Sequence, residues 1–386
     1  MDIVKLKDLT VDGKGTYGVA APAVEYQENL PTYLRITDIL DDGTLNLSEL
    51  KSVKVPDSER YMLRPNDVVF ARTGGSTGRN YFYDGTDGAF VYAGFLIKFS
   101  LDPKKVNPKF IKYFCQSEQY KQWVRSFNTG STRGNINAQT FGNMEIALPG
   151  RKQQDHLVSI LESIDKKIKL NKKINDNLQQ QAAALFSSLY NRSNTEVRYT
   201  DLIQILGGGT PKTGETAYWN GNIAFFTPKD VGTPYTFITE KTITEEGLSH
   251  CNSRLYPVNT VFVTARGTVG KVGLSGVPMA MNQSCYALVG KETHQLLVYF
   301  YTLKVVDRLK HKASGAVFDA ITTRDFESEQ IMKLSDDDGR AFLCVAEPMF
   351  QEILNNSIEN LRLSTLRDFL LPKLMSDEMD VSNIQF

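Results

Sequence analysis

Two stretches of the chain place apolar residues at alternating spacings of three and four, the pattern of a helix that packs along one face. The first extends from about Gln153 to Tyr190 and contains no glycine or proline. Its apolar positions are Leu157, Leu161, Ile164, Ile168, Leu178, Leu185 and Leu189. Asn171 and Asn175 occupy two positions of the same stripe, where a polar residue lowers stability but fixes the register of a coiled coil. The pattern predicts one long, uninterrupted helix.

The second stretch begins at about Pro348, a tolerated first-turn position, and ends at about Leu371, because Pro372 is expected to stop it. Its stripe consists of Phe350, Leu354, Ile358, Leu361, Thr365 and Phe369. An isolated helix would leave this stripe in water, so we expect the two helices to pack on each other. The first helix is rich in lysine and the second in glutamate, which either sets their orientation or reflects solvated faces.

Short β-type runs separated by Gly, Pro and Asn turns fill the rest of the chain, with occasional short helices. Examples are the runs AFVYAGFLIKF and NIAFFTP. This alternation predicts an α+β fold. The expected order is a globular domain at 1–150, a long helix at 151–192, a second globular domain at 193–336 and a second long helix at 337–386.

The two globular segments repeat each other. VVFARTGGSTGR (68–79) resembles VFVTARGTVGK (261–271): an apolar run, then Ala-Arg, a turn rich in small residues, and Gly with a basic residue. Further on, GSTRGNINAQTF (130–141) aligns with GAVFDAITTRDF (315–326) without a gap, pairing Ile136 with Ile321 and Phe141 with Phe326. An internal duplication of this kind predicts two related domains.

The two turns are candidate DNA contacts, because backbone N–H groups and hydroxyls can hold phosphates while an arginine fork reaches a guanine edge. The candidates are Arg72, Thr73, Ser76 and Arg79 in the first turn and Arg266, Thr268 and Lys271 in the second. The alternative is that the glycines only permit tight hairpins and the basic residues are solvated. The duplication favours DNA contact, because both halves keep the arginine, the turn and the basic residue.

The segment TGSTRGNIN (129–137) offers three further side chains suited to base edges, Arg133, Asn135 and Asn137. Its counterpart SGAVFDAIT is much less polar. Either the two halves read different bases, or one of the two loops is structural.

Catalytic motifs are not apparent. The Gly74–Arg79 turn lacks the spacing of a P-loop, and no GxGxxG follows a β-type run. The four cysteines and four histidines show no metal-ligand spacing. For the cysteines, this favours reduced thiols in a cytoplasmic protein. Apolar runs are too short to cross a bilayer, and the N-terminus lacks a signal peptide's apolar region. The formal net charge is zero, so we expect DNA affinity to depend on a basic partner.

With these motifs, the chain resembles the specificity subunit of type I restriction–modification systems along essentially its whole length. The most specific segments are LRDFLLPKLMSDEM (366–379) and AAALFSSLY (182–190). GGTPKTGETAYWNGNIAFFTPKDV (208–231) is similar to the opening of that family's target-recognition domains. The opening of the N-terminal half, GKGTYGVAAPAVEY, looks like another sub-type, and its arginine turn carries two extra residues.

The resemblance implies two target-recognition domains in pseudo-twofold repeat, joined by two helices packed as an antiparallel coiled coil. It further implies a chain without catalytic activity that reads a bipartite site in double-stranded DNA and positions two modification subunits, with restriction subunits as further partners. S-adenosylmethionine, and ATP with Mg²⁺ where a restriction subunit is present, would then be bound by the partners. Two other classes stay open: a methyltransferase or nuclease with diverged motifs, and a coiled-coil adaptor that does not contact DNA.

Overall fold

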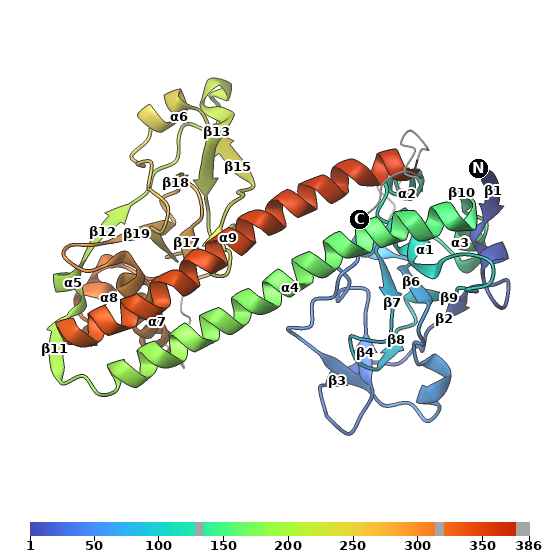
Figure 1. Cartoon of the computed structure of the whole chain (residues 1–386), viewed down its shortest axis with the longest axis horizontal. Coiled ribbons are helices and arrows are strands. Elements are labelled where there is room, and N and C mark those ends of the chain that lie inside the picture. The colour runs from blue at the N-terminus through green and yellow to red at the C-terminus, as the bar shows by residue number, and fades with distance from the viewer. Residues whose placement is uncertain (128–133, 313–319, 376–386) are drawn as a thin grey trace. The chain divides into compact units, whose positions relative to one another are not determined.

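The computed structural model describes residues 1–127, 134–312 and 320–375, and divides into two units (Figure 1). Unit 1 comprises Met1–Lys167 and Arg362–Phe386, and unit 2 comprises Ile168–Leu361. Two helices of 40 residues each contribute to both units: α4 (Arg151–Tyr190) and α9 (Asp336–Met375). Each unit therefore contains one globular domain and a segment of each long helix.

The globular domain of unit 1 mixes short strands with short helices. Its strands are β1 (Asp2–Lys5), β2 (Thr16–Tyr17), β3 (Ala23–Glu25), β4 (Thr32–Leu34), β5 (Lys51–Val53), β6 (Asp67–Ala71), β7 (Asn80–Tyr83), β8 (Phe90–Tyr92), β9 (Leu96–Ser100) and β10 (Glu145–Leu148). Its helices are α1 (Pro108–Phe114), α2 (Glu118–Arg125) and α3 (Ala138–Gly142), with 3₁₀ turns at Leu6–Leu9, Ser58–Tyr61 and Gly74–Ser76.

The globular domain of unit 2 has the same kinds of element. Its strands are β11 (Thr195–Arg198), β12 (Ile203–Gly207), β13 (Trp219–Phe226), β14 (Tyr235–Thr236), β15 (Lys241–Ile243), β16 (Val261–Thr264), β17 (Val272–Ser275), β18 (Met279–Met281), β19 (Cys285–Gly290) and β20 (Gln330–Lys333). Its helices are α5 (Tyr199–Leu202), α6 (Glu245–Ser249), α7 (Gln295–Lys312) and α8 (Thr323–Glu327), with a 3₁₀ turn at Thr216–Tyr218.

Strand order confirms the duplication. The sheet β2-β9-β6-β7 of unit 1 corresponds to β12-β19-β16-β17 of unit 2, where β14 adds a fifth strand. A second sheet, β3-β5-β4-β8, corresponds to β15-β13-β18, and in both a parallel pair, β4 with β8 or β13 with β18, sits in an otherwise antiparallel arrangement. The pair β1-β10 corresponds to β11-β20. The α+β fold is thus built twice, despite the different opening sequence of the first domain.

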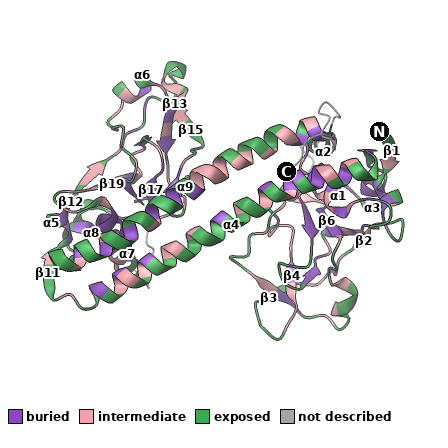
Figure 2. Cartoon of the chain, viewed as in Figure 1, coloured by how far each residue is buried: buried purple, intermediate pink, exposed green. Residues whose placement is uncertain are grey.

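Local chemistry is repeated with the strand order. After β4, the carboxylate of Asp38 accepts from the backbone N–H of Arg35 at 2.7 Å; after β13, Asp230 accepts from Thr227 at 2.8 Å. These short polar side chains close the turn because they replace a backbone acceptor. The central strands β6 and β16 are buried at every position, so each domain's core lies on both faces of its first sheet (Figure 2).

Helix α4 matches its prediction: it starts two residues before Gln153 and ends at Tyr190. Leu157, Leu161, Ile164 and Leu189 of the predicted stripe are buried, and Asn171 is fully buried. The remaining apolar members of the stripe are half-buried, and Phe186, which was not predicted, joins the buried face. The three-four spacing was sufficient because it is a local property of the helix.

Helix α9 differs from its prediction at both ends. It starts at Asp336, twelve residues before Pro348 and one residue before the expected segment 337–386, and it continues past Pro372 to Met375, the last residue that the structure describes. A proline inside a helix leaves the carbonyl four residues earlier without its N–H partner. Here Pro348 and Pro372 are exposed, and so are Cys344 and Asp368 four residues before them. Water can satisfy those carbonyls, so the prolines do not end the helix.

The stripe predicted for α9 is correct only in its first half. Phe350 and Leu354 are buried, but Thr365 is exposed and the Phe369 side chain is 55% exposed. Leu371 and Leu374 are buried instead. Near its C-terminal end, α9 therefore buries positions next to those that the apolar spacing predicted.

The two long helices pack antiparallel. In unit 2, the Asn171 amide donates to Glu359 at 2.7 Å and to Asn360 at 3.0 Å, while the Asn175 amide donates to Ser357 at 3.2 Å. Closer to the globular domain of the unit, the rings of Phe186 and Phe342 meet edge to face. Residue numbers rise in α4 as they fall in α9, which confirms the antiparallel coiled coil.

Candidate nucleic-acid interface

The arginine turn of unit 1 lies between β6 and β7, and the 134–138 loop packs against it. The backbone N–H of Ile136 donates to the carbonyl of Arg72 at 2.9 Å, and Thr73 forms a β-bridge with Asn135. Asn135 is exposed. Two of the predicted segments, more than 60 residues apart in the sequence, therefore form one surface of the domain.

Arg72 is held over the ring of Tyr17. Its guanidinium carbon lies 5.2 Å from the ring centroid, and Nη2 donates to Asn135 Oδ1 at 3.4 Å. Its Nε is buried and has no hydrogen-bond partner among the described residues. A stacked guanidinium keeps a fixed direction while its fork stays available for bidentate contacts.

The other unit 1 candidates have roles within the domain. Arg79 donates from Nε to Asp41 Oδ1 at 2.6 Å and from Nη1 to the carbonyl of Ile39 at 3.1 Å, so a phosphate would have to replace Asp41. Ser76 is buried. Asn137 caps α3 by accepting from the N–H of Thr140 at 2.8 Å. Arg133 lies outside the described residues.

Unit 2 presents its candidates more openly. Arg266, Thr268 and Lys271 are all exposed. The backbone N–H of Ile321 donates to the carbonyl of Ala265 at 2.9 Å, so the turn again meets the segment that follows the aligned loop. The Thr268 hydroxyl donates to the carbonyl of Pro228 at 3.0 Å. Residues 313–319, most of the counterpart of TGSTRGNIN, lie outside the described residues.

Backbone hydrogen bonds correct the pairing of Arg72 with Arg266. The N–H of Arg72 donates to the carbonyl of Phe95 at 3.0 Å, and its counterpart in unit 2 is Ala265, which donates to Ser284 at 2.8 Å. Arg266 therefore corresponds to Thr73. The Ala-Arg letters match in sequence, but the strand register sets the two arginines one residue apart, and neighbouring residues in an extended chain point in different directions.

Sequence reasoning missed Tyr17 and Phe95 at this surface. Tyr17 ends β2 and is 43% exposed, and Phe95 precedes β9 and is 59% exposed. Both belong to unremarkable β-type runs, far from the arginine turn in the sequence. Only the pairing of β2 and β6 with β9 brings them beside Arg72.

Other chemistry finds little support in the described parts of the chain. No group of three or more His, Cys, Asp or Glu side chains is placed there to hold a metal ion. The cysteines are free thiols, and burial raises the pKa of the Cys285 thiol to about 12, which disfavours a reactive thiolate. No described helix is both long and apolar enough to span a membrane.

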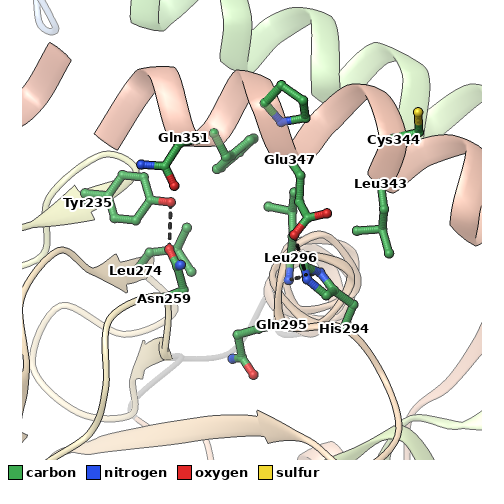
Figure 3. Close-up of a pocket in the computed structure, with 12 residues that line it drawn as sticks. Tyr235, Asn259, Leu274, His294, Gln295, Leu296, Leu343, Cys344, Glu347 and Gln351 are labelled. Carbon is green, nitrogen blue, oxygen red and sulfur yellow. Dashed lines mark hydrogen bonds and ion pairs between the residues drawn. The ribbon is translucent and has the colours of Figure 1, made fainter. Parts of the chain in front are cut away.

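Unit 2 also contains a cavity of about 390 Å³ between its first sheet, the start of α7 and α9 (Figure 3). The Tyr235 hydroxyl donates to Asn259 Oδ1 at 2.8 Å, and His294 Nε2 lies 3.0 Å from Glu347 Oε1. These four polar side chains on its wall are thus paired with each other. None of the candidate DNA contacts that the structure describes lines this cavity.

Comparison with known proteins points to one family. A family model described as the type I restriction modification DNA specificity domain matches residues 3–180 and 191–333. The HindI specificity subunit of a type I restriction enzyme from Haemophilus influenzae is 21% identical, with 90% of this chain and 94% of that protein aligned. The MjaIX specificity subunit from Methanocaldococcus jannaschii is 32% identical over 31% of this chain and 29% of its own length.

A solved structure shares the fold. The crystal structure of a type I restriction–modification S subunit from M. genitalium superposes with a TM-score of 0.59 at 15% identity, over 99% of this chain and 96% of that one.

Proposed function

Because the chain belongs to the family of type I restriction–modification DNA specificity proteins, we propose that it reads a two-part DNA sequence, one part with each unit. The family assignment makes it a DNA-recognition subunit with a non-catalytic role. The duplicated surface is the observation that supports reading of a two-part target. Each domain brings an arginine turn against a second loop at the same end of its first sheet, and the side chains presented there differ.

Arg72 and Arg266 are the residues we expect to contact base edges. Arginine reads guanine through a bidentate contact in the major groove. Thr73, Asn135, Thr268 and Lys271 lie in the same turns and loops and fit phosphate or base contacts. Arg79, Ser76 and Asn137 support the turn and the loop in the free protein, so we assign them a smaller share of DNA binding. Arg133 stays a candidate on its sequence alone.

The long helices offer each unit a place for a partner. In unit 2, Leu170 and Ile174 of α4 are 53% and 37% exposed; in unit 1, Leu366 and Phe369 of α9 are 45% and 55% exposed. Residues spaced by three or four share one helix face, so each pair forms a small apolar patch. Each patch is a candidate contact for a modification subunit, and such subunits would supply the S-adenosylmethionine site and the methyl transfer. A restriction subunit would add ATP-dependent cleavage.

Domain exchange tests the two-part reading. We would replace residues 1–150 with the same segment of a relative that reads another target, and assemble both proteins with their modification subunits. Methylated sites in a random DNA library should then change in one half-site and stay the same in the other. A change in both half-sites contradicts independent reading. The chain alone should not methylate DNA when given S-adenosylmethionine; if it does, it is an enzyme.

A further inference from the structure

Tyr17 is fixed at both its backbone and its hydroxyl. It pairs with Ile97 in the β2-β9 ladder, and its oxygen accepts from the N–H of Ala138 at 3.1 Å. The next residue, Gly18, lies so close to the carbonyls of Tyr92 and Ala93 that a Cβ there would sit 2.3 Å from their oxygens. The strand thus approaches its neighbour as closely as glycine allows, which leaves the tyrosine ring little freedom.

The ring is the main restraint on the Arg72 guanidinium. Nε has no hydrogen-bond partner in the described chain, and the bond from Nη2 to Asn135 is long at 3.4 Å. The stacking distance of 5.2 Å, by contrast, is well within the range of a cation–π contact. Without the aromatic face, the long arginine side chain would sample many rotamers and would have to be ordered when DNA binds.

Unit 2 has no such ring at this position. Gly207 pairs with Tyr286 where Tyr17 pairs with Ile97. Gly208, like Gly18, lies against two backbone carbonyls, with an added Cβ at 2.2 Å from that of Asn282, which confirms the correspondence. Gly207 is exposed, and Arg266, one position further along the turn than Arg72, is exposed as well.

We propose that Tyr17 is a positioning residue for sequence reading by unit 1: its ring holds the Arg72 fork in the direction that a guanine edge requires. Unit 2 reads without this device, with an arginine that becomes ordered on the DNA. The proposal rests on the proposed function, and it makes the two half-sites respond differently to the same kind of substitution.

The test compares Tyr17→Leu, which removes the ring, with Tyr17→Phe, which keeps the ring and loses the hydroxyl. Tyr26→Leu is the matched control, because Tyr26 is 47% exposed in the same domain and forms no stack with Arg72. Each protein is assembled with the modification subunits. Dissociation constants are measured for the cognate DNA and for two DNAs in which only one half-site is scrambled.

Tyr17→Leu should lower the preference for the intact first half-site by roughly 2- to 30-fold, the loss of one cation–π contact of about 0.5–2 kcal/mol. The preference for the second half-site and the melting temperature should not change. Tyr26→Leu should leave the preferences for both half-sites at their wild-type values. Tyr17→Phe should retain at least half of the wild-type preference. Combined with Arg72→Ala, Tyr17→Leu should cost nothing further, because the ring acts through the arginine.

Three outcomes would overturn the proposal. Equal loss at both half-sites would show a general effect on folding or DNA affinity. Tyr17→Phe as weak as Tyr17→Leu would assign the effect to the hydroxyl and the Ala138 loop. An unchanged first half-site preference in Tyr17→Leu would remove the ring from recognition. If the wild-type complex prefers neither intact half-site, the proposed function fails, a result that these variants cannot produce.

Discussion

The two units attach their recognition domains to the long helices with opposite chemistry. In unit 1, Lys112 and Tyr113 of α1 each reach Asp165 of α4 at 2.9 Å, and Arg367 of α9 reaches the same carboxylate at 3.2 Å. In unit 2, the junction is aromatic. The ring of Phe350 on α9 meets the rings of Tyr299 and Phe300 on α7 edge to face, with centroids 5.7 and 5.6 Å apart.

These residues occupy corresponding positions. The gapless alignment of the two halves pairs Asp165 with Phe350, and Ala182 with Arg367. Helices α1 and α7 begin with the same cap: Asn107 accepts from the N–H two residues on at 3.0 Å, and His294 does so at 3.3 Å. Counted from these caps, Lys112 and Tyr113 correspond to Tyr299 and Phe300. An ionic group has thus been exchanged, residue for residue, with an apolar one.

The difference shows that the geometry of the junction does not depend on one kind of interaction. Both versions join a helix of the domain, α1 or α7, to the corresponding turn of the helix pair. Their costs differ. Apolar contacts contain no group that protons neutralise or salt screens. A carboxylate and its cations, by contrast, must be desolvated together, and they contribute less when one partner is removed or neutralised. We therefore expect the stability of unit 1 to depend more on pH and salt than the stability of unit 2.

The largest effect should come from Phe350→Ala, which removes a nearly fully buried ring from the unit 2 junction. Deleting a buried phenylalanine costs about 3–5 kcal/mol of unfolding free energy. The chain has two tryptophans, Trp123 in unit 1 and Trp219 in unit 2. Tryptophan fluorescence during urea unfolding therefore reports unit 2 in a Trp123→Phe background and unit 1 in a Trp219→Phe background.

Phe369→Ala is the control for this substitution, because the same residue type in the same helix is 55% exposed. It should cost less than about 0.5 kcal/mol. A loss in the Phe350→Ala protein that appears equally at Trp123 and Trp219 would show that the two units unfold as one, and would end the comparison.

A smaller effect should follow Arg367→Met, which keeps the apolar stem and removes one of the cations beside Asp165. The Arg367 and Asp165 side chains are 23% and 22% exposed, so solvent weakens the pair and the expected loss is about 1–3 kcal/mol, seen at Trp123. Arg362→Met, at an exposed position of the same helix, should change little. Greater stability in the Arg367→Met protein would mean that desolvation outweighs attraction in this junction.

The smallest expected effect is the loss of unit 1 stability as the pH is lowered. Burial acts to raise the pKa of Asp165, but Lys112, Tyr113 and Arg367 outweigh it and hold the pKa below its ordinary value. The unfolded chain then binds this proton more readily, so the stabilisation is present above the ordinary aspartate pKa of about 3.9 and disappears as pH falls through the lower folded value. Glu162 behaves in the same way beside Lys109.

Urea midpoints measured between pH 6 and pH 3 should therefore fall earlier at Trp123 than at Trp219. Asp165→Asn should make the urea midpoint at Trp123 less dependent on pH and should lower that midpoint at pH 6. If the urea midpoints at Trp123 and Trp219 fall equally with pH, unit 1 is not the more acid-sensitive unit.

The sequence by itself determined the features that depend on local spacing or on self-similarity. The duplication, the α+β fold and the course of α4 were correct, because the three-four spacing and the absence of glycine and proline act within one element. Arg72 and Arg266 became candidates because each follows an apolar run, and their role in DNA contact stays a prediction. The segment TGSTRGNIN (129–137) became a candidate because it gathers Arg133, Asn135 and Asn137, and its role also stays a prediction.

Tertiary structure decided the rest. Whether α9 continues through Pro348 and Pro372 depends on which side of the helix faces water. Which residues of α9 are buried depends on what each of its turns packs against. The correspondence of Arg266 with Thr73 depends on strand register. Tyr17 meets Arg72 only because β9 pairs with both β2 and β6. These outcomes are contacts between distant segments, and a pattern along one segment contains no information about the partner that it will meet.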